Sequence, residues 1–581
     1  MSKQKNRKVR IYLPFFILFL AFFIIETRLY NLQIIKHKEL TQQVRKNQIK
    51  RVDVLPERGI IYDRNLEKLA INIPSYSLYA CPKKISHPEK LAEQLSSILG
   101  IKSSSLLAQL KKKKVFLWLK RKLPLAKKEE IESLHLEGIG FIEESERFYP
   151  QKELASHILG FTGIDNQGLA GVELYYEREL RGEKGHFWIR EDALGYEIPL
   201  TRRVLQNLVP GKDIVLTIDN IIQSIVEQEI SLTLRKTKAK SVEAIFMDPR
   251  TGEILALANK PDYDPNRYAD YSSFSRKNRV VQSIYEPGST FKPITASVIL
   301  EEKLVTAGES IYCQGSIKIA NHTFHDWKAF NRNLTLAEIL ENSSSIGMIK
   351  LASRMSEKLF SKYIKLFGFG QRTGIDLPGE AKGIVRASSL WSLTDLPAIS
   401  IGQAIAVTPL QMISAFCALI NEGKLLRPYL VKYVCDSEGK IIKENKPTMV
   451  RKVISSSTSA QIRKLLEQVV EKGTGKRAKV RGYSIGGKTG TAQIPAPTGK
   501  GYLPNKYISS FMGFAPVASP RIAGIVIIKE PTGAYYGGEI AAPLFARIMK
   551  RVLPYLDVLP EKEEWVKIEI SQKLRGKYYA P

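Results

Sequence analysis

The chain has 581 residues, 44% of them hydrophobic and 25% charged, a balance typical of a globular protein with about three or four folding units. It excludes a wholly disordered, a collagen-like and a polytopic membrane protein. The 88 Lys and Arg against 58 Asp and Glu give a net charge of +30, which indicates either an anionic neighbour, nucleic acid or lipid, or a lysine-coated surface. No pair among the four cysteines has CxxC spacing, which argues against a zinc ribbon and leaves a single disulfide open.

The N-terminus carries a basic segment followed by an uncharged apolar run. Residues 1–10 are rich in Lys and Arg, and residues 11–25 read IYLPFFILFLAFFII. A cleaved signal peptide is the alternative, but no small-x-small site follows Ile25. We therefore expect a transmembrane anchor over residues 11–30, with residues 1–10 cytoplasmic and the rest of the chain outside, because positive flanks stay inside. This location disfavours nucleic acid as a partner.

Mixed structure is expected between the anchor and residue 210. Residues 31–50 are predicted to continue the helix out of the membrane, and beyond them short strand-like runs alternate with turns. The lysine-dense residues 110–130 are predicted to form a solvated helix pair, with contact to anionic headgroups as the alternative. The Pro-Gly pair at 210–211 indicates a domain boundary.

Residues 211–556 are expected to form one mixed α/β domain. Residues 213–234 read as a strand followed by a helix, and residues 244–258 and 509–528 each read as two apolar strands around a turn. Strands at both ends with helical segments between them predict a single domain with a substantial core. The charged residues 557–581 are expected to be a peripheral tail.

The stretch EPGSTFKP at residues 286–293 places a serine and a lysine at a turn-to-helix junction. Pro293 is tolerated in a first helical turn, so the helix should begin close to Ser289, which puts Ser289 and Lys292 on one face. A serine hydroxyl becomes a nucleophile when an adjacent amine takes its proton, and a helix N-terminus offers N–H groups to an oxyanion. Alone the S-x-x-K pattern indicates little, because the chain contains it three times and an ordinary helix start explains it.

Two further motifs follow in the chain. NSSSIG at residues 342–347 lies on a helix-like segment, and GKTGT at residues 487–491 reads as a strand whose glycines would let a ligand backbone approach. The order S-x-x-K, then an S-x-N-like motif, then K-T-G is that of the active sites of penicillin-binding proteins and serine β-lactamases.

On these motifs the sequence resembles the class B penicillin-binding proteins, the monofunctional peptidoglycan D,D-transpeptidases, and within them the cell-division (FtsI) group. Further segments extend the resemblance over nearly the whole chain: RGIIYDRN at 58–65, RFYP at 147–150, GLAGVE at 168–173, SIGQAIAVTPLQM at 400–412, GTGKRA at 473–478, FMGFAP at 511–516 and GGEIAAPLF at 537–545. The resemblance implies a mixed α/β transpeptidase domain over residues 211–556, with an antiparallel sheet flanked by helices. It also implies an elongated α+β pedestal over residues 31–210, and neither a metal nor a cofactor.

The family roles carry over to the matching residues. Ser289 would be the acylated nucleophile, Lys292 its proton acceptor with Lys488 nearby, and Ser343 the group that relays a proton to the leaving D-alanine. The substrate would be bound by Lys488 and by Ser345, Thr489, Gly490 and Thr491. The backbone amides of Ser289 and Thr491 would form the oxyanion hole.

Three positions depart from the family's pattern. Ser345 stands where the middle motif usually has Asn, and a hydroxyl cannot reach as far as an amide. Leu66 and Ala404 stand where Gly is usual, which puts the turn at Leu66 in question.

The pair His322 and His325 invites a metal, but no third ligand is evident, so a structural or substrate-rim role is favoured.

The resemblance implies a transpeptidase of the bacterial cytoplasmic membrane that crosslinks stem peptides on nascent glycan from lipid II through a serine acyl-enzyme, in septal wall synthesis. β-Lactams would be covalent inhibitors, and a SEDS-type glycan polymerase and divisome membrane proteins would be partners. The alternatives are a D,D-carboxypeptidase or β-lactamase, which the long pedestal argues against, a non-enzymatic sensor, and an elongation-specific transpeptidase. The acceptor amine and the identity of the general base stay open.

Overall fold

The computed structural model describes residues 3–41, 49–54, 56–112, 114, 116–190, 203–306, 308–496 and 501–561. The chain divides into two compact units, Met1–Glu57 with Gly182–Pro210, and Arg58–Arg181 with Gly211–Pro581. The domain limits expected at residues 31, 211 and 557 stay predictions, and residues 562–581 of the expected tail lie outside the described residues.

The first unit begins with helix α1 (Lys3–Tyr30), which continues into the π-helical turn η1 (Asn31–Ile35). Tyr12–Ile35 is long and apolar enough to cross a membrane, somewhat longer than the expected anchor, and its side chains are largely exposed. The expected helix over residues 31–50 is only partly correct. Residues 42–48 are not described, and Ile49–Val54 form strand β1, which pairs with β6 (Gly185–Arg190), itself paired with β7 (Arg203–Gln206).

A five-stranded antiparallel sheet forms the centre of the second unit, in the order β10-β9-β21-β20-β19. Its strands are β9 (Ser241–Met247), β10 (Ile254–Lys260), β19 (Gly486–Pro495), β20 (Tyr502–Ala515) and β21 (Ile522–Lys529). Both predicted hairpins, β9 with β10 and β20 with β21, are confirmed. Because β9 neighbours β21, strands from both ends of the domain share one sheet.

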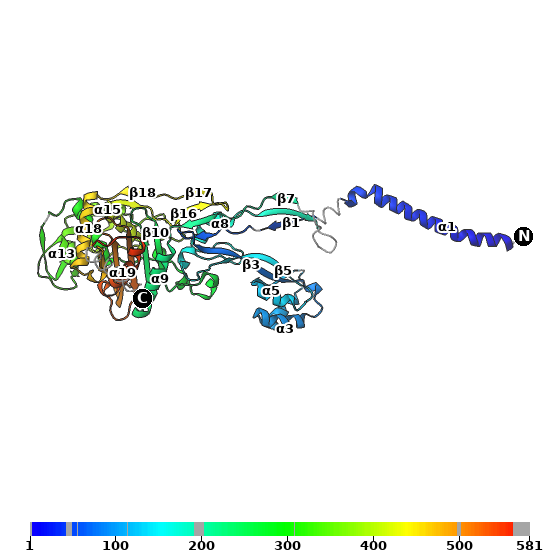
Figure 1. Ribbon diagram of the computed structural model, residues 1–581, viewed down its shortest axis with the longest axis horizontal. Helices are drawn as coiled ribbons and strands as arrows, with labels where there is room; N and C mark the ends of the chain where they lie inside the picture. The colour runs from blue at the N-terminus through cyan, green and yellow to red at the C-terminus, as the bar shows by residue number, and fades with distance from the viewer. Residues whose placement is uncertain are drawn as a thin grey trace, which may run out of the picture. The chain divides into compact units, whose positions relative to one another are not determined.

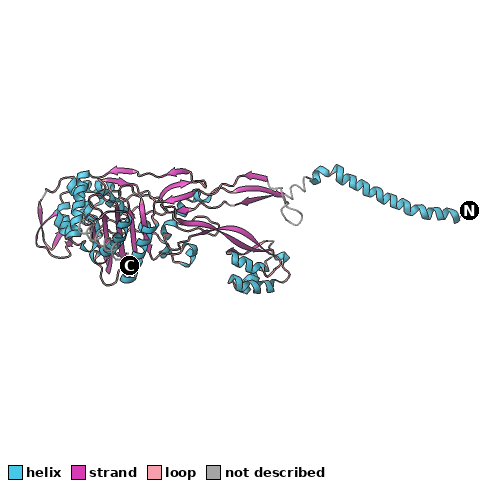
Figure 2. Cartoon of the chain, in the orientation of Figure 1, coloured by secondary structure: helices cyan, strands magenta, loops and turns pink. Residues whose placement is uncertain are grey.

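Helices cover both faces of this sheet (Figures 1 and 2). Along β9, Val242, Ala244 and Phe246 face a core shared with α9 (Asn220–Thr237) and α19 (Gly537–Tyr555), as strand alternation requires. The alternate residues Ile245 and Met247 face a larger core. That core includes α12 (Lys292–Glu301), α14 (Ser345–Ala352), α17 (Pro409–Ile420) and α18 (Ser456–Glu471).

Shorter elements complete the described part of this domain. The helices are η3 (Pro265–Asp270), α10 (Ser273–Arg276), α11 (Arg279–Gln282), η4 (Gly288–Phe291), α13 (Leu336–Glu341), α15 (Glu357–Leu366), η5 (Ser388–Leu390), α16 (Asp395–Ser400) and η6 (Lys476–Ala478). The strands pair as β11 (Ser310–Cys313) with β14 (Arg332–Thr335), β12 (Ser316–Ile319) with β13 (His322–His325), and β15 (Lys424–Leu426) with β18 (Met449–Lys452). All four cysteines are free, so the disulfide left open by the sequence is not formed.

A seven-stranded sheet joins segments from before and after residue 210. Its order is β17-β16-β8-β2-β3-β4, and β5 also pairs with β3. Its strands are β2 (Ile61–Tyr62), β3 (Lys68–Ala80), β4 (Leu117–Leu123), β5 (Ile139–Phe148), β8 (Asp213–Leu216), β16 (Val431–Cys435) and β17 (Ile441–Glu444). The parallel pairing of β2 with β8 ties the RGIIYDRN segment directly to a strand that follows residue 210.

The lysine-rich segment differs from the predicted helix pair. Its centre is strand β4, preceded by α4 (Ser103–Leu110) and followed by α5 (Leu125–Glu132). Leu119 and Leu123 pack into a small core with α3 (Pro88–Leu99), whereas Lys120 is exposed. An apolar-polar alternation of period two outweighed the helix propensity of the lysines.

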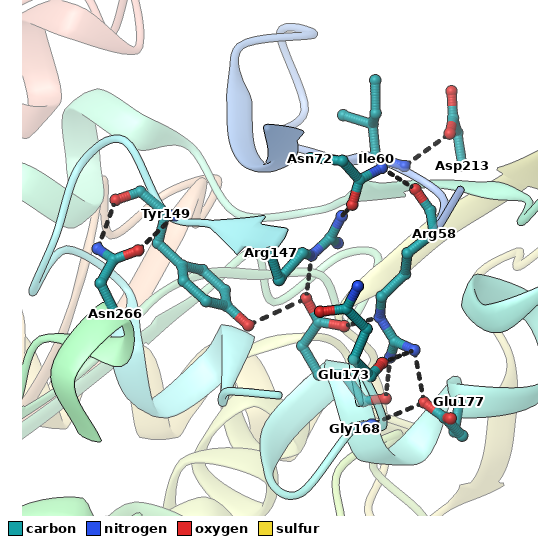
Figure 3. A network of polar contacts seen from close by, with 11 residues as sticks. Arg58, Ile60, Asn72, Arg147, Tyr149, Gly168, Glu173, Glu177, Asp213 and Asn266 are labelled. Atoms are coloured by element: carbon teal, nitrogen blue, oxygen red, sulfur yellow. Dashed lines mark hydrogen bonds and ion pairs between the residues drawn. The ribbon is translucent and has the colours of Figure 1, made fainter. Parts of the chain in front are cut away.

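The short helices α6 (Ser156–Leu159), α7 (Gly171–Tyr175) and α8 (Glu177–Arg181), and the turn η2 (Pro82–Lys84), complete the region before residue 182. A buried charge network forms here (Figure 3). Glu173 accepts from Arg58 Nε at 2.6 Å and from Arg147 Nε at 2.7 Å, and all three side chains are at most 2% exposed. Burial would raise the pKa of Glu173, but the guanidinium groups of Arg147 and Arg58 outweigh it and hold that pKa below its usual value. Three segments that carry the family resemblance therefore meet at one buried carboxylate.

Candidate active site

The segment around Ser289, the predicted nucleophile, forms a turn that leads into helix α12. Ser289 lies in the 3₁₀ turn η4, and α12 begins at Lys292 with Pro293 in its first turn, close to the predicted helix start. Gly288 adopts φ +55° and its N–H donates to Gly402 O over 2.9 Å. A Cβ at Gly402 would overlap the carbonyl oxygen of Gly288, so the SIGQ segment packs directly behind the nucleophile turn.

Two fully buried lysines converge on the middle motif. Lys292 Nζ donates to the carbonyl oxygen of Ser343 at 2.6 Å and to Ser345 Oγ at 3.2 Å. Lys488 Nζ, from β19, donates to Ser343 Oγ at 2.9 Å, and Lys292 Nζ lies 3.5 Å from the same hydroxyl. The S-x-x-K, middle and K-T-G motifs therefore meet at one place in the structure.

The middle motif lies only partly on a helix, whereas a helix-like segment was expected for all of it. Ser343 occupies the turn between α13 and α14, with φ +57°, and Ser345 is the first residue of α14. A left-handed conformation is costly for a non-glycine residue, so the surrounding contacts must hold it. The reduced reach expected of Ser345 does not separate it from the site, because its hydroxyl still contacts Lys292.

Burial changes the charge states of both lysines. It lowers the pKa of Lys292 to about 7, although the carboxylate of Asp326 acts in the opposite direction. Burial also lowers the pKa of Lys488 well below its usual value, and the charge of Lys292 adds to this effect. A neutral amine can accept a proton, so the site holds a base beside the Ser343 hydroxyl near neutral pH.

The K-T-G strand is held by hydroxyl contacts and close packing. Thr489 Oγ1 lies 2.8 Å from Thr474 Oγ1, and Thr491 Oγ1 accepts from Gly537 N at 3.0 Å. A Cβ at Gly490 would come within 2.8 Å of Thr290 Cγ2 and would overlap Ser510 Oγ. This glycine therefore lets β19 approach the nucleophile turn, whereas the sequence pattern had indicated close approach of a ligand.

A cavity of about 720 Å³ opens over these groups. Its lining includes five of the predicted site residues: Ser289, Ser343, Ser345, Thr489 and Thr491. Aromatic side chains and His325 form other parts of the wall, which places His325 at the rim of the site. Among the described residues no group of three His, Cys, Asp or Glu could hold a metal ion.

Sequence reasoning missed several residues that shape this site. Asp326 lines the cavity and contacts the middle motif, and Thr474 contacts Thr489. Asp326 directly follows His325, and Thr474 lies within the GTGKRA segment, but nothing in the local pattern showed which residues they would meet. Ala404 and Leu66, which replace the family's usual glycines, adopt φ +56° and φ +67° and so explain why glycine is favoured there.

Comparison with known proteins agrees with this geometry. Residues 242–550 match the family described as the Penicillin binding protein transpeptidase domain, and residues 53–216 match the Penicillin-binding Protein dimerisation domain.

The chain belongs to the class B penicillin-binding proteins.

Relatives of this penicillin-binding protein match it over most of its length. Stage V sporulation protein D of Bacillus subtilis is 38% identical over 97% of this chain and 88% of its own. The probable peptidoglycan D,D-transpeptidase PenA of Neisseria meningitidis is 36% identical, covering 89% and 87%, and the peptidoglycan D,D-transpeptidase FtsI of Escherichia coli is 31% identical, covering 91% and 89%. The expected resemblance and enzyme class are confirmed: this penicillin-binding protein is a peptidoglycan D,D-transpeptidase.

Solved structures of class B penicillin-binding proteins share the fold. Penicillin binding protein 3 of Mycobacterium tuberculosis, complexed with aztreonam, superposes with a TM-score of 0.71 at 27% identity, covering 88% of this chain and 98% of that one. Penicillin binding protein 2X of Streptococcus thermophilus gives 0.72 at 26% identity, covering 87% and 80%. The predicted mixed α/β penicillin-binding fold is confirmed.

Proposed function

We propose that this transpeptidase crosslinks peptidoglycan stem peptides through an acyl-enzyme on Ser289, in septal wall synthesis during division. One observation carries the assignment of residues: two buried lysines meet the Ser343 hydroxyl beneath a cavity that Ser289 lines. A serine nucleophile is activated by an adjacent base, and an amine whose pKa is lowered by burial can act as that base.

Acylation begins with Ser289 Oγ attacking the carbonyl carbon of the D-Ala–D-Ala bond. The Ser289 proton passes to neutral Lys292 Nζ, from the lysine three residues further along the chain at the start of α12. The negative charge that develops on the carbonyl oxygen is stabilised by the backbone amides of Ser289 and Thr491. Thr489, Gly490 and Thr491 line up the peptide along β19, and Lys488 attracts its terminal carboxylate.

The leaving D-alanine needs a proton on its nitrogen. Ser343 Oγ lies between Lys292 and Lys488, so it can give its proton to that nitrogen and recover one from a neighbouring ammonium. The acyl-enzyme then passes to an amine of a neighbouring stem peptide, which forms the crosslink and frees Ser289. β-Lactams acylate the same serine and leave it slowly.

Mass spectrometry of the ectodomain after penicillin treatment tests the nucleophile. We expect a single adduct on Ser289 and no labelling by a fluorescent penicillin in Ser289→Ala. Ser283→Ala is the matched control, because Ser283 lies six residues earlier and does not line the cavity. Labelling of Ser289→Ala at the rate of the unaltered protein would disprove the assignment, and labelling lost only in that variant would also exclude a non-enzymatic sensor.

Hydrolysis is the second reaction that the same groups support. A D,D-carboxypeptidase or β-lactamase would pass the acyl group to water, and the segment of more than a hundred residues ahead of the active site would then have no evident use. Release of penicilloate over many turnovers would favour a hydrolase, whereas one penicillin bound per active site favours the transpeptidase.

The septal role rests on the resemblance to proteins named FtsI. A role in sporulation is a second candidate, because a relative named Stage V sporulation protein D is 38% identical over 97% of the chain. Elongation of the side wall is the third. A fluorescent fusion that gathers at midcell supports division, one that follows the side wall supports elongation, and one confined to sporulating cells supports the second candidate.

We also propose that Tyr12–Ile35 anchors the enzyme once in the bacterial cytoplasmic membrane. The basic residues before it support an N-terminus in the cytoplasm and a catalytic domain outside. Protease added to spheroplasts should then digest the catalytic domain without lysis. A SEDS-type glycan polymerase and divisome membrane proteins are the proposed partners, to be tested by copurification from detergent-solubilised membranes.

A further inference from the structure

Asp326 makes a set of contacts with the middle motif that the reaction scheme above does not use. Its Oδ2 accepts from Ser344 Oγ at 2.8 Å, and its Oδ1 accepts from Ile346 N at 3.2 Å and from Ser345 N. The three donors belong to consecutive residues directly after Ser343. One carboxylate therefore holds the start of α14 and the end of the Ser343 turn.

Trp327, the residue after Asp326, supports the other side of the Ser343 turn. Trp327 Nε1 donates to the carbonyl oxygen of Asn342 at 2.9 Å. Asp326 and Trp327 together contact the residues on either side of Ser343, whose φ of +57° is costly without support. This geometry directs the carbonyl oxygen of Ser343 to Lys292 and its hydroxyl to Lys488.

Asp326 also acts on the charge of Lys292. Burial disfavours the ammonium form of Lys292, and the Asp326 carboxylate favours it. Lys488 is the second buried amine at this place, and its pKa is lowered well below its usual value by burial and by the charge of Lys292. The hydroxyls of Ser343 and Ser345, which contact Lys292 Nζ, carry no charge.

We propose that Asp326 is a positioning residue of the transpeptidase. Its carboxylate holds the Ser343 turn in the geometry that both lysines need, and it stabilises Lys292 after that amine has taken the proton of Ser289. The proton moves from Ser289 Oγ to Lys292 Nζ, and no bond to Asp326 forms or breaks. The inference rests on the proposed function, since it assigns Lys292 as the proton acceptor.

The test separates the charge of Asp326 from its shape. Asp326→Asn keeps the size of the side chain and one acceptor oxygen but removes the charge, whereas Asp326→Ala removes both. The readout is the second-order rate of acylation by a fluorescent penicillin from about pH 5 to 9, together with thermal unfolding of each variant.

Asp376→Asn is the matched control. Asp376 is a buried carboxylate that, like the partly buried Asp326, has three donors, here Leu430 N, Val431 N and Tyr176 Oη at 2.7, 2.8 and 3.0 Å, but it does not line the cavity. It reports what the same substitution costs through folding alone.

In Asp326→Asn we expect the acidic limb of the acylation profile to move to lower pH by about 0.5 to 1 unit, because the pKa of Lys292 falls when its anionic neighbour is removed. In Asp326→Ala we expect acylation to fall by about 10- to 100-fold, because the turn loses its support. Asp326→Glu restores the charge and should return the acidic limb towards its original pH. Asp376→Asn should lower the unfolding temperature and leave the limb in place.

The inference is overturned if the limb stays in place in Asp326→Asn and the plateau rate stays within about twofold in Asp326→Ala. It is also overturned if Asp326→Asn and Asp376→Asn lower acylation and the unfolding temperature equally, since Asp326 would then support the fold alone. Failure of the proposed function is distinguished by a different measurement. Penicillin would then still label Ser289→Ala, a result that does not depend on the Asp326 variants.

Discussion

Lys488 Nζ donates a 2.9 Å hydrogen bond to Ser343 Oγ, although the two residues lie 145 positions apart in the chain. The same hydroxyl lies 3.5 Å from Lys292 Nζ, so it bridges the two buried amines. A hydroxyl can donate and accept at once, which makes Ser343 the group through which a proton can pass between them.

Removal of this bridge should slow acylation without unfolding the protein. We expect Ser343→Ala to lower the acylation rate by about 10²- to 10⁴-fold, the range of a lost proton-transfer group. Stopped-flow labelling by a fluorescent penicillin measures it. Ser297→Ala is the control, because that hydroxyl is buried in α12 and bonds only to Ile294 O among the described residues. Equal rates for the two variants would contradict the proposed relay.

The pH dependence of acylation should follow Lys292. Burial lowers the pKa of this amine to about 7, so it is neutral above that pH and able to accept the Ser289 proton. We expect the acylation rate to rise through about pH 7 and to fall by roughly tenfold per pH unit on the acidic side. A rate constant that stays flat from about pH 5.5 to 8, with the fold intact by circular dichroism, would show that another group is the base.

Burial of the Lys292 amine should cost stability. Its folded pKa lies near 7 and its ordinary value is 10.5, so the native state binds fewer protons than the unfolded chain in that window, and stability rises with pH there. The cost is fully present below pH 7 and disappears above 10.5. We expect Lys292→Met to raise the free energy of unfolding at pH 7 by about 1 to 3 kcal/mol, net of the bond lost to Ser343 O, while abolishing acylation.

Urea unfolding of Lys292→Met across this pH range checks the sign. Lys350→Met is the control, because that amine is partly exposed and donates to Tyr312 O and to Gln314. It should give no gain in stability. A gain for Lys292→Met that did not shrink as the pH rises would mean that packing, and not charge burial, is responsible.

The buried network at Glu173 should be a main source of stability around the predicted pedestal. Glu173→Gln leaves the guanidinium groups of Arg58 and Arg147 without their carboxylate, and we expect a loss of about 3 to 5 kcal/mol in urea unfolding. Because the pKa of Glu173 in the folded protein lies below the ordinary 4.5, the stabilisation is present above that pH and is lost as the pH falls through the folded value. The difference between the two proteins should therefore shrink in acid.

Glu177→Gln is the matched control for this network. Glu177 also binds Arg58, at 2.6 Å, but its side chain is 26% exposed, so we expect a loss of about 1 kcal/mol or less. Equal losses for the two substitutions would contradict the central place of Glu173.

Glycine at position 66 should stabilise the protein. Leu66 adopts φ +67° with its side chain 59% exposed, so it pays for a left-handed conformation and gains little from burial. We expect Leu66→Gly to raise the free energy of unfolding by up to about 1 kcal/mol, less the entropy that glycine loses on folding. Leu232→Gly, at a 52% exposed position inside α9, should lower it by about 1 kcal/mol. The same sign for both would disprove the role of the backbone angle.

Local features of this protein were predictable because they depend on neighbours in the chain. The apolar run before residue 35, the hairpins of β9 with β10 and of β20 with β21, and the start of a helix just after Ser289 all follow from spacing and turn chemistry. Expectations from local propensity were wrong where tertiary packing favoured another conformation. Strand β4 forms within a lysine-rich run, and Ser343 lies in a turn and not in a helix.

The tertiary structure decided what those motifs can do. The low pKa values of Lys292 and Lys488 come from burial by elements distant in sequence, which spacing does not report. Asp326 reaches the site from the turn after β13. A glycine is needed at position 490 because Thr290 and Ser510 pack against it. The sequence determines the order of the motifs. Their chemistry depends on the tertiary fold, which excludes water from the amines of Lys292 and Lys488 and places the Ser343 hydroxyl between them.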